Sequence, residues 1–278
     1  MKLAEKLWHY VSLLSLDVAL GAMAGLLFFS QLLRVDIGWQ IFLLLGLAVW
    51  SIYTGDHLWD ANQAKVLVSH RHSFHAKNKK TLSGILLLVV LLGMTLAFRI
   101  LGLGKEFYLS VILGGVILLT MILLRKAGRA SGYLKEFSTS VFYVLGIAWI
   151  PMLRANPEDL ILKPLLFFLF FIALAFLNLL MLAELDRKDD RAQGFASVAA
   201  MMDPGKLILG IRRLNFLLIF LGLAGFILLN SFYRPFTCVL MLIALIHFLS
   251  FFRTNLSAEA KRKRMEASFL LPWLLLVL

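Results

Sequence analysis

The chain is poor in charge and in cysteine. Of its 278 residues, 61% are hydrophobic and only 16% are charged, which is far from the composition of a soluble globular domain. The single cysteine, Cys238, excludes a disulfide framework and a Cys-based metal motif, and we expect it to be a small buried residue. Neither a polar linker nor a low-complexity segment divides the chain, so residues 1–278 are expected to form one membrane domain.

Long apolar runs recur along the whole sequence. A helix needs about 17–25 apolar residues to cross a bilayer core of about 30 Å. The sequence therefore predicts an all-α fold, a polytopic membrane protein with about nine transmembrane helices. The last span is short, since only 14 residues follow Arg264, unless its helix begins within the basic segment before it. The predicted spans cover residues 8–33, 37–54, 82–98, 106–124, 137–153, 164–183, 207–230, 235–252 and 265–278.

The positive charges are unevenly distributed between the predicted connections. The N-terminus and the connections after spans two, four, six and eight hold 22 of the 28 Lys and Arg residues. By the positive-inside rule this side faces the cytoplasm, which places the C-terminus outside. The run KRKR at 261–264 is then a topology anchor, and the net charge of +12 requires no nucleic-acid partner. The first apolar run continues past Asp17 to Leu33, which suits a retained span rather than a cleaved signal.

Two pairs of aspartates stand out in a chain with only 16 acidic residues. Asp56 and Asp60 follow the second predicted span, and Asp186 and Asp190 follow the sixth. Like charges four residues apart cost a helix about 0.2–0.5 kcal/mol, so a compensating ligand is expected. Carboxylates at this spacing suit Mg²⁺, which takes one or two carboxylates together with substrate phosphates. One such pair is most simply a solvated helix end, but two matched pairs indicate a site for a metal-bound diphosphate.

Basic residues accompany both pairs, as a diphosphate requires. They are Lys65, Arg71 and Lys77 after the first pair, and Arg187, Lys188 and Arg191 around the second.

The two acidic segments resemble the motifs of the UbiA superfamily of intramembrane prenyltransferases, which are written roughly NxxxDxxxD and DxxxDxxxG. The segment RKAGRASGYLKEF, between the fourth and fifth predicted spans, is similar to the family's basic connection. The first motif departs from the pattern, because Ile52 stands where the family usually has Asn and SHRHSFHAKN replaces the usual basic loop. The second motif is similar to that of bacterial members, which implies the bacterial inner membrane. Its residues are Asn178, Asp186, Asp190, Gly194 and Ser197.

The resemblance implies a fold and an activity. The fold would be a helical bundle around a lipid-accessible central cavity, with cytoplasmic cap loops at about 55–81 and 184–206. The activity would be Mg²⁺-dependent transfer of a prenyl group from a prenyl diphosphate to a lipophilic acceptor. The resemblance gives the catalytic and metal-binding roles to Asp56, Asp60, Asp186 and Asp190. It gives substrate binding to Lys65, Arg71, Lys126, Lys188, Asn178 and His57.

Asp17 interrupts the first predicted span about 16 Å beyond Lys6, at 1.5 Å per residue. An ionised Asp there costs about 2.5–3.5 kcal/mol, so Asp17 is expected to face the cavity and contact substrate. It would orient the acceptor or take its proton, or it would bond a neighbouring helix, and the sequence favours these equally.

The histidines after the first acidic pair could form a transition-metal site, because imidazole is a common metal ligand. Among His70, His72 and His75, only the last two share a helix face. The segment is therefore expected to be a wet basic loop near anionic headgroups, which also closes over the diphosphate.

Several alternatives use the same features. Cyclisation of a prenyl diphosphate without an acceptor would use the same fold. A transporter or lipid-binding protein would use the acidic pairs to bind or relay cations, although transporters place ion sites nearer the bilayer midplane. CDP-alcohol phosphotransferases require an Asp-Gly-x-x-Ala-Arg element, which follows neither Asp56 nor Asp186. The glycine runs at 102–105 and 113–115 lack the strand-loop-helix setting of a phosphate loop.

Overall fold

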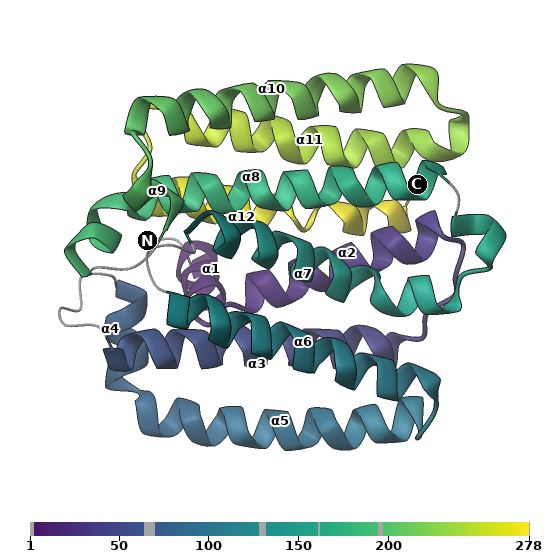
Figure 1. Ribbon diagram of the computed structural model, residues 1–278, viewed down its shortest axis with the longest axis horizontal. Helices are drawn as coiled ribbons and strands as arrows, with labels where there is room; N and C mark the ends of the chain where they lie inside the picture. Colours follow the sequence, from purple (N-terminus) through teal and green to yellow (C-terminus); the bar gives the residue numbers. More distant parts are fainter. Residues whose placement is uncertain (1–2, 64–69, 128–131, 161, 194–196, 278) are drawn as a thin grey trace.

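The computed structural model describes residues 3–63, 70–127, 132–160, 162–193 and 197–277, and within these ranges the chain forms helices and no strand (Figure 1). The long apolar runs favour this, because a helix satisfies its backbone hydrogen bonds internally. The elements are α1 (Leu3–Leu13), α2 (Leu16–Leu32), α3 (Trp39–Gln63), α4 (His70–Lys77), α5 (Lys79–Leu101), α6 (Lys105–Ala127), α7 (Gly132–Arg154), η2 (Pro157–Leu160), α8 (Leu162–Gln193), α9 (Val198–Met201), α10 (Pro204–Leu228), η3 (Ser231–Tyr233), α11 (Arg234–Phe251), α12 (Ala258–Ser268) and η4 (Leu271–Leu276).

Seven segments of the described chain are long and apolar enough to cross a membrane. They are α3, α5, α6, α7, α8, α10 and the continuous stretch of η3 and α11. The bent pair of α1 and α2 raises the number to eight if it is counted as one span. The prediction of an all-helical protein with several membrane-spanning helices is therefore confirmed for the described residues, whereas the predicted nine spans exceed the seven or eight found there.

The first predicted span is broken into α1 and α2, which meet at an angle of 79°. The break lies at Ser15, whose φ of 55° is left-handed. The carbonyl of Leu14 accepts a hydrogen bond from the indole N–H of Trp50 at 3.0 Å, so this backbone group outside the helix is satisfied. Asp17 turns its Oδ1 to the backbone N–H of Val18, at 2.9 Å. Short polar side chains compete with helical hydrogen bonds in this way, which explains a break inside a run that otherwise reads as one span.

The last predicted span begins earlier than expected and is not one continuous helix. The hydroxyl of Ser257 caps the first turn of α12, so the helix starts before the basic run and contains it. After α12 the chain continues as η4, because Pro272 has no N–H with which to extend an α-helix. The side-chain amide of Gln31 donates to the carbonyl of Leu275 at 3.2 Å, which holds η4 beside the C-terminal end of α2.

The core of the bundle is organised around α2, which packs against α3, α7, α12 and η4. Phe28 of α2 is fully buried and meets three rings edge-on. These rings are Phe29 of the same helix, Phe171 of α8 and Phe236 of α11, with centroids 5.3–5.5 Å away. Aromatic pairs of this kind contribute about 0.5–1.5 kcal/mol each beyond the burial of their area. They join α2, α8 and α11 into one rigid unit.

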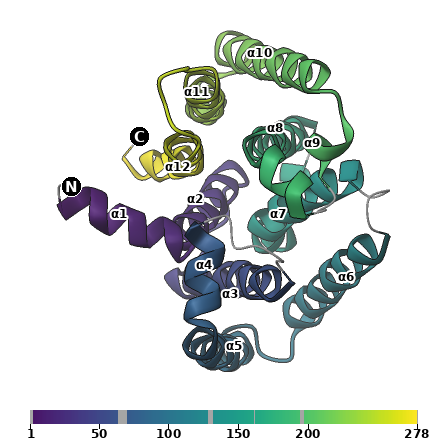
Figure 2. The same cartoon turned by 90° about the vertical axis from the view of Figure 1, so that its left-hand side faces the viewer.

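α5 and α6 lie at the edge of the bundle (Figure 2). Over the apolar windows of these two helices, none of the residues is buried. α5 packs mainly against α3, and α6 packs against α5 and α7. Large apolar side chains such as Leu88 of α5 and Leu119 of α6 are instead exposed, which is typical of a surface in contact with lipid.

The close crossing of α10 and α11 provides a test of the packing. A Cβ added at Gly222 would lie 2.7 Å from the Cβ of Met241 and 3.2 Å from its Cα. We expect Gly222→Ala to lower the free energy of unfolding by about 1–3 kcal/mol, because the two backbones must separate. Gly210→Ala is the matched control, since a Cβ at Gly210 on the same helix meets nothing within 4 Å. Thermal unfolding in detergent compares the two, and equal melting temperatures would contradict the close crossing.

Candidate functional site

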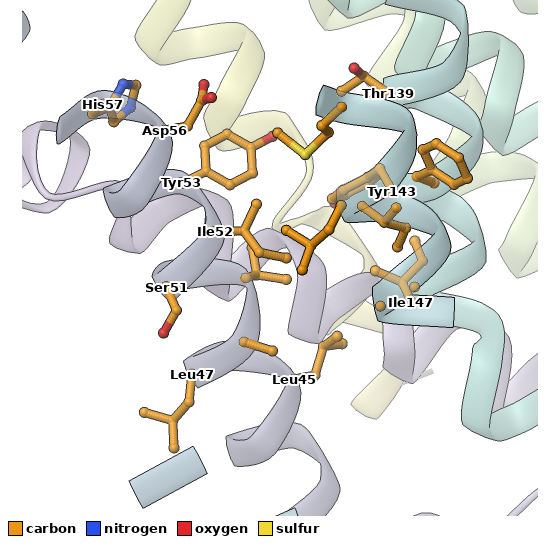
Figure 3. Close-up of a pocket in the computed structure, with 18 of the residues that line it drawn as sticks. Leu45, Leu47, Ser51, Ile52, Tyr53, Asp56, His57, Thr139, Tyr143 and Ile147 are labelled. Carbon is orange, nitrogen blue, oxygen red and sulfur yellow. The ribbon is translucent and has the colours of Figure 1, made fainter. Parts of the chain in front are cut away.

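A cavity of about 1520 Å³ lies among α3, α5, α6 and α7. Most of its wall is apolar. Leu45 and Ile52 of α3 and Ile147 of α7 line it (Figure 3), as do Met94 of α5 and Leu118 of α6. α5 and α6 are apolar on almost every face, so the sides that they turn to the cavity are as apolar as those that they turn outward.

The charged side chains of the cavity gather at one end, which we call the polar end. They come from the C-terminal parts of α3, α6 and α8 and from the N-terminal parts of α7 and α12, together with α1. These helix ends lie at the left in Figure 1 and face the viewer in Figure 2. The charged or titratable lining residues are His9, Asp56, His57, Lys126, Lys135, Glu136, Asp186, Glu259, Arg262 and Lys263.

Asp56 lies on the side of α3 that faces α7. Figure 3 shows its carboxylate one helical turn beyond the Tyr53 ring, with Thr139 and Tyr143 of α7 on the facing wall. Further along the same two helices most of the labelled residues are apolar, such as Leu45, Leu47 and Ile147, with Ser51 as an exception. The wall thus changes from carboxylate and hydroxyl groups to hydrocarbon along the cavity.

One carboxylate from each predicted acidic pair lines this cavity. They are Asp56 of α3 and Asp186 of α8, although the two helices are distant in the sequence. The remaining predicted residues cannot be placed in the same way. The side chains of Asp60, Asp190 and Arg71, and the whole of Lys65, lie outside the residues that the structure describes.

One face of α8 lines the cavity. Predicted residues of α8 line the cavity only if they lie on this face. Its members are Leu179, Leu182, Ala183 and Asp186, at the 3–4 residue spacing of one helix face. Two predicted substrate-binding residues of this helix are off this face. Lys188 is exposed and Asn178 has a buried Oδ1 without a hydrogen-bond partner among the described residues, and neither lines the cavity.

The other predicted substrate-binding residues divide between the cavity and the protein interior. Lys126 and His57 line the cavity. Asp17 does not line it: the side chain is fully buried in the first turn of α2, where it accepts the bond from Val18. The expectation that Asp17 faces the cavity therefore finds no support in the lining residues.

The histidine-rich segment is not wholly a wet loop. Residues 70–77 form α4, which packs against α3 and α5. His75 is only 1% exposed, and its ring centroid lies 5.1 Å from that of His57 on α3. The helix buries His75 against α3, a contact between segments that the sequence pattern alone does not reveal.

α12 and α1 also contribute to the polar end, which no motif in the sequence predicted. Arg262 binds both carboxylate oxygens of Asp186 through Nη2, each at 2.5 Å. Lys263 binds Glu259 at 2.7 Å and also lies 3.2 Å from Nδ1 of His9. The KRKR run could have indicated this contribution. Its charges were interpreted only as a topology anchor, which requires no contact with another helix.

Glu136 joins α7 to the segment that follows the second acidic motif. Its Oε1 accepts a hydrogen bond from the backbone N–H of Val198 at 3.0 Å. The hydroxyl of Ser197 caps the same short helix, α9, by accepting from the N–H of Ala200 at 3.2 Å. Since Glu136 and Ser197 both line the cavity, these bonds fix part of its polar end.

The charged side chains of the polar end balance one another among the described residues. Among the described lining residues, four Lys or Arg side chains stand against four carboxylates. These described groups together carry no net positive charge. Mg²⁺ needs only one or two protein carboxylates when phosphates complete its shell. Asp56 and Asp186 are the two predicted aspartates among the described lining residues. The described residues contain no group of three acidic, His or Cys side chains that could hold a metal by themselves.

The bond from Val198 to Glu136 can be tested directly. We expect Glu136→Ala to speed amide hydrogen exchange at Val198 about tenfold, because losing a hydrogen bond to a carboxylate costs about 1.5 kcal/mol. Lys135→Ala is the matched control, since Lys135 is the exposed neighbour on the same helix. Exchange followed by mass spectrometry in detergent measures both variants. Unchanged protection at Val198 in Glu136→Ala would contradict the assignment.

A scan of protein-family models, a search of curated proteins and a search of solved structures each found no match to the chain.

Proposed function

We propose that this protein transfers a prenyl group from a prenyl diphosphate to a lipophilic acceptor in the membrane, with Mg²⁺ as cofactor. One observation carries the proposal: Asp56 and Asp186, one from each acidic motif, line the same charged end of one apolar cavity. A diphosphate and its metal match the charged end, and an isoprenoid tail matches the apolar wall. The resemblance of the two motifs to the UbiA superfamily supports the same activity.

The size of the cavity supports a reaction between two substrates. Pockets for single small ligands usually measure about 300–1,000 Å³. At about 1520 Å³ this cavity is larger, so a prenyl tail and a lipophilic acceptor can occupy it together. Transfer is therefore favoured over cyclisation, which needs room for one substrate.

The residues have distinct roles in this proposal. The predicted aspartates hold Mg²⁺ on the diphosphate, and Lys126 and Lys135 bind its outer oxygens. Mg²⁺ supplies neutralisation of the charge that develops on the departing diphosphate. The apolar walls of α5 and α6 exclude water from the allylic carbon, so that the acceptor rather than water attacks it.

The proposed topology places the polar end at the cytoplasmic face of a bacterial inner membrane. The excess of Lys and Arg in the predicted cytoplasmic connections supports this orientation. α1 lies at the left and the C-terminal mark at the right of the bundle in Figure 1, as a cytoplasmic N-terminus and an external C-terminus require. Membrane lipids would then surround α5 and α6.

Ion-coupled transport is a second candidate, which the break between α1 and α2 favours. Asp17 is fully buried beside this break, and transporters often bind ions at broken helices. Asp17 lies outside the lining of the cavity, however, whereas a transport site must open to both sides of the membrane. Prenyl transfer accounts for more of the lining residues.

Thermal stability in detergent tests the proposed substrate. A prenyl diphosphate with Mg²⁺ should stabilise the protein by about 2.7 kcal/mol at a hundredfold excess over its Kd. Neither component alone should do so, because each depends on the other for charge neutralisation. Asp56→Asn should remove most of this stabilisation. Asp36→Asn, an exposed Asp in the connection at the opposite end of α3, should retain it.

Stabilisation of the protein by a prenyl diphosphate in the presence of a metal chelator would overturn the metal-dependent proposal, as would equal stabilisation of Asp56→Asn. Incubation with geranyl, farnesyl or geranylgeranyl diphosphate and a membrane lipid extract then separates the reactions. We expect a prenylated lipid together with released diphosphate. If a cyclic hydrocarbon forms without an acceptor, the reaction is cyclisation rather than transfer.

A further inference from the structure

The four basic residues of the KRKR run on α12 have four different surroundings. Lys261 donates to the carbonyl of Phe251 at the end of α11, at 2.7 Å. Lys263 is held by Glu259 on its own helix. Arg264 is exposed and does not line the cavity. Arg262 differs from these three residues, because it reaches across to the second acidic motif and binds Asp186.

Arg262 lies where an anionic ligand at the polar end would meet it. Both Arg262 and Asp186 line the cavity, and their side chains are 23% and 41% exposed, so the pair stands at the surface of the cavity rather than within the packed core. α12 also packs against α2 and α8, which fixes the position from which the Arg262 side chain extends. A guanidinium held in this way presents planar donors that match phosphate oxygens.

We propose that Arg262 is a diphosphate-binding residue, supplied by the last helix of the chain and positioned by Asp186. This inference rests on the proposed function and adds a residue that the motifs do not contain. Arg262 binds the two oxygens of Asp186 that would hold a Mg²⁺ ion. If Asp186 held the ion, Arg262 would be released to bind the phosphate oxygens of the ligand. The site would thereby keep both charges paired throughout binding.

The exchange has a consequence for affinity that a structural ion pair would not have. Loss of Arg262 weakens binding of the diphosphate group and leaves binding of the hydrocarbon tail unchanged. A partly exposed ion pair contributes little to folding by itself, so the variant should remain folded. The two effects are separated with a prenyl diphosphate and the prenyl alcohol of the same length.

The test uses the full chain in detergent and measures thermal stabilisation by ligand. The probes are geranyl, farnesyl and geranylgeranyl diphosphate with Mg²⁺, and the corresponding alcohols. We expect Arg262→Gln to bind the best diphosphate roughly ten- to hundredfold more weakly than the unmodified protein, as loss of a hydrogen bond to a charged group predicts, and to bind its alcohol equally well. Arg264→Gln, the same change two residues along the same helix, should bind both as the unmodified protein does. Arg262→Lys should recover part of the lost affinity, since it restores the charge without the planar donors.

The outcomes distinguish this inference from the proposed function. If the unmodified protein and Arg262→Gln bind the diphosphate equally, Arg262 is only a structural partner of Asp186, and the proposed function stands. If Arg262→Gln loses affinity for diphosphate and alcohol alike, the residue supports the cavity as a whole and the assignment is overturned. If no prenyl diphosphate stabilises the unmodified protein with Mg²⁺, the proposed function fails and this inference fails with it.

Discussion

Hydrocarbon offers no hydrogen bonds to a peptide group, and this constraint determines where the chain can be irregular and where it can carry charge. Most of the described chain is therefore helical, and the one break within the first predicted span has a partner for its exposed carbonyl, because Trp50 donates to Leu14. Charged side chains collect at the helix ends for the same reason. Since neighbouring helices alternate in direction, residues from distant parts of the sequence meet at one end of the bundle. Asp56, Lys135, Asp186 and Arg262 share the polar end through this geometry.

The bundle combines a tightly packed half with a half that leaves space. On one side, Phe28 brings α2, α8 and α11 together through edge-on ring contacts. On the other side, α5 and α6 bury almost nothing and leave the cavity between themselves, α3 and α7. Arg154 of α7 binds Glu106 of α6 through two hydrogen bonds, at 2.8 and 2.7 Å, far from the polar end. This pair joins α6 to α7 at the end of the bundle opposite the polar end, and neither residue lines the cavity.

The sequence predicted those features that depend on composition along the chain. The predicted spans 106–124 and 235–252 agree with α6 and α11 to within three residues at each end, because their apolar runs end at charged residues. The predicted span 164–183 ends ten residues before α8 does. Hydrophobicity marks the part of a helix that lies in lipid, whereas α8 continues into charged residues that are equally compatible with a helix.

The features that the sequence did not predict depend on contacts between distant residues. The burial of His75 against His57 and the pairing of Arg262 with Asp186 each require a neighbour from another helix. For the candidate site, the acidic motifs singled out Asp56 and Asp186, and both line one cavity. The same motifs gave Asn178 and Lys188 a role at that site, but neither lies on the face of α8 that lines the cavity.

The separation of the packed half from the cavity wall has a consequence for how such a protein can diverge. Residues that hold the bundle together, such as Phe28 and Phe171, are not those that shape the cavity. Side chains of α5 and α6 such as Met94 and Leu118 can change in volume without disturbing the aromatic contacts, so their mutations carry little cost in stability. The depth and width of the cavity are therefore free to drift under selection for new ligands, while the aromatic framework preserves folding.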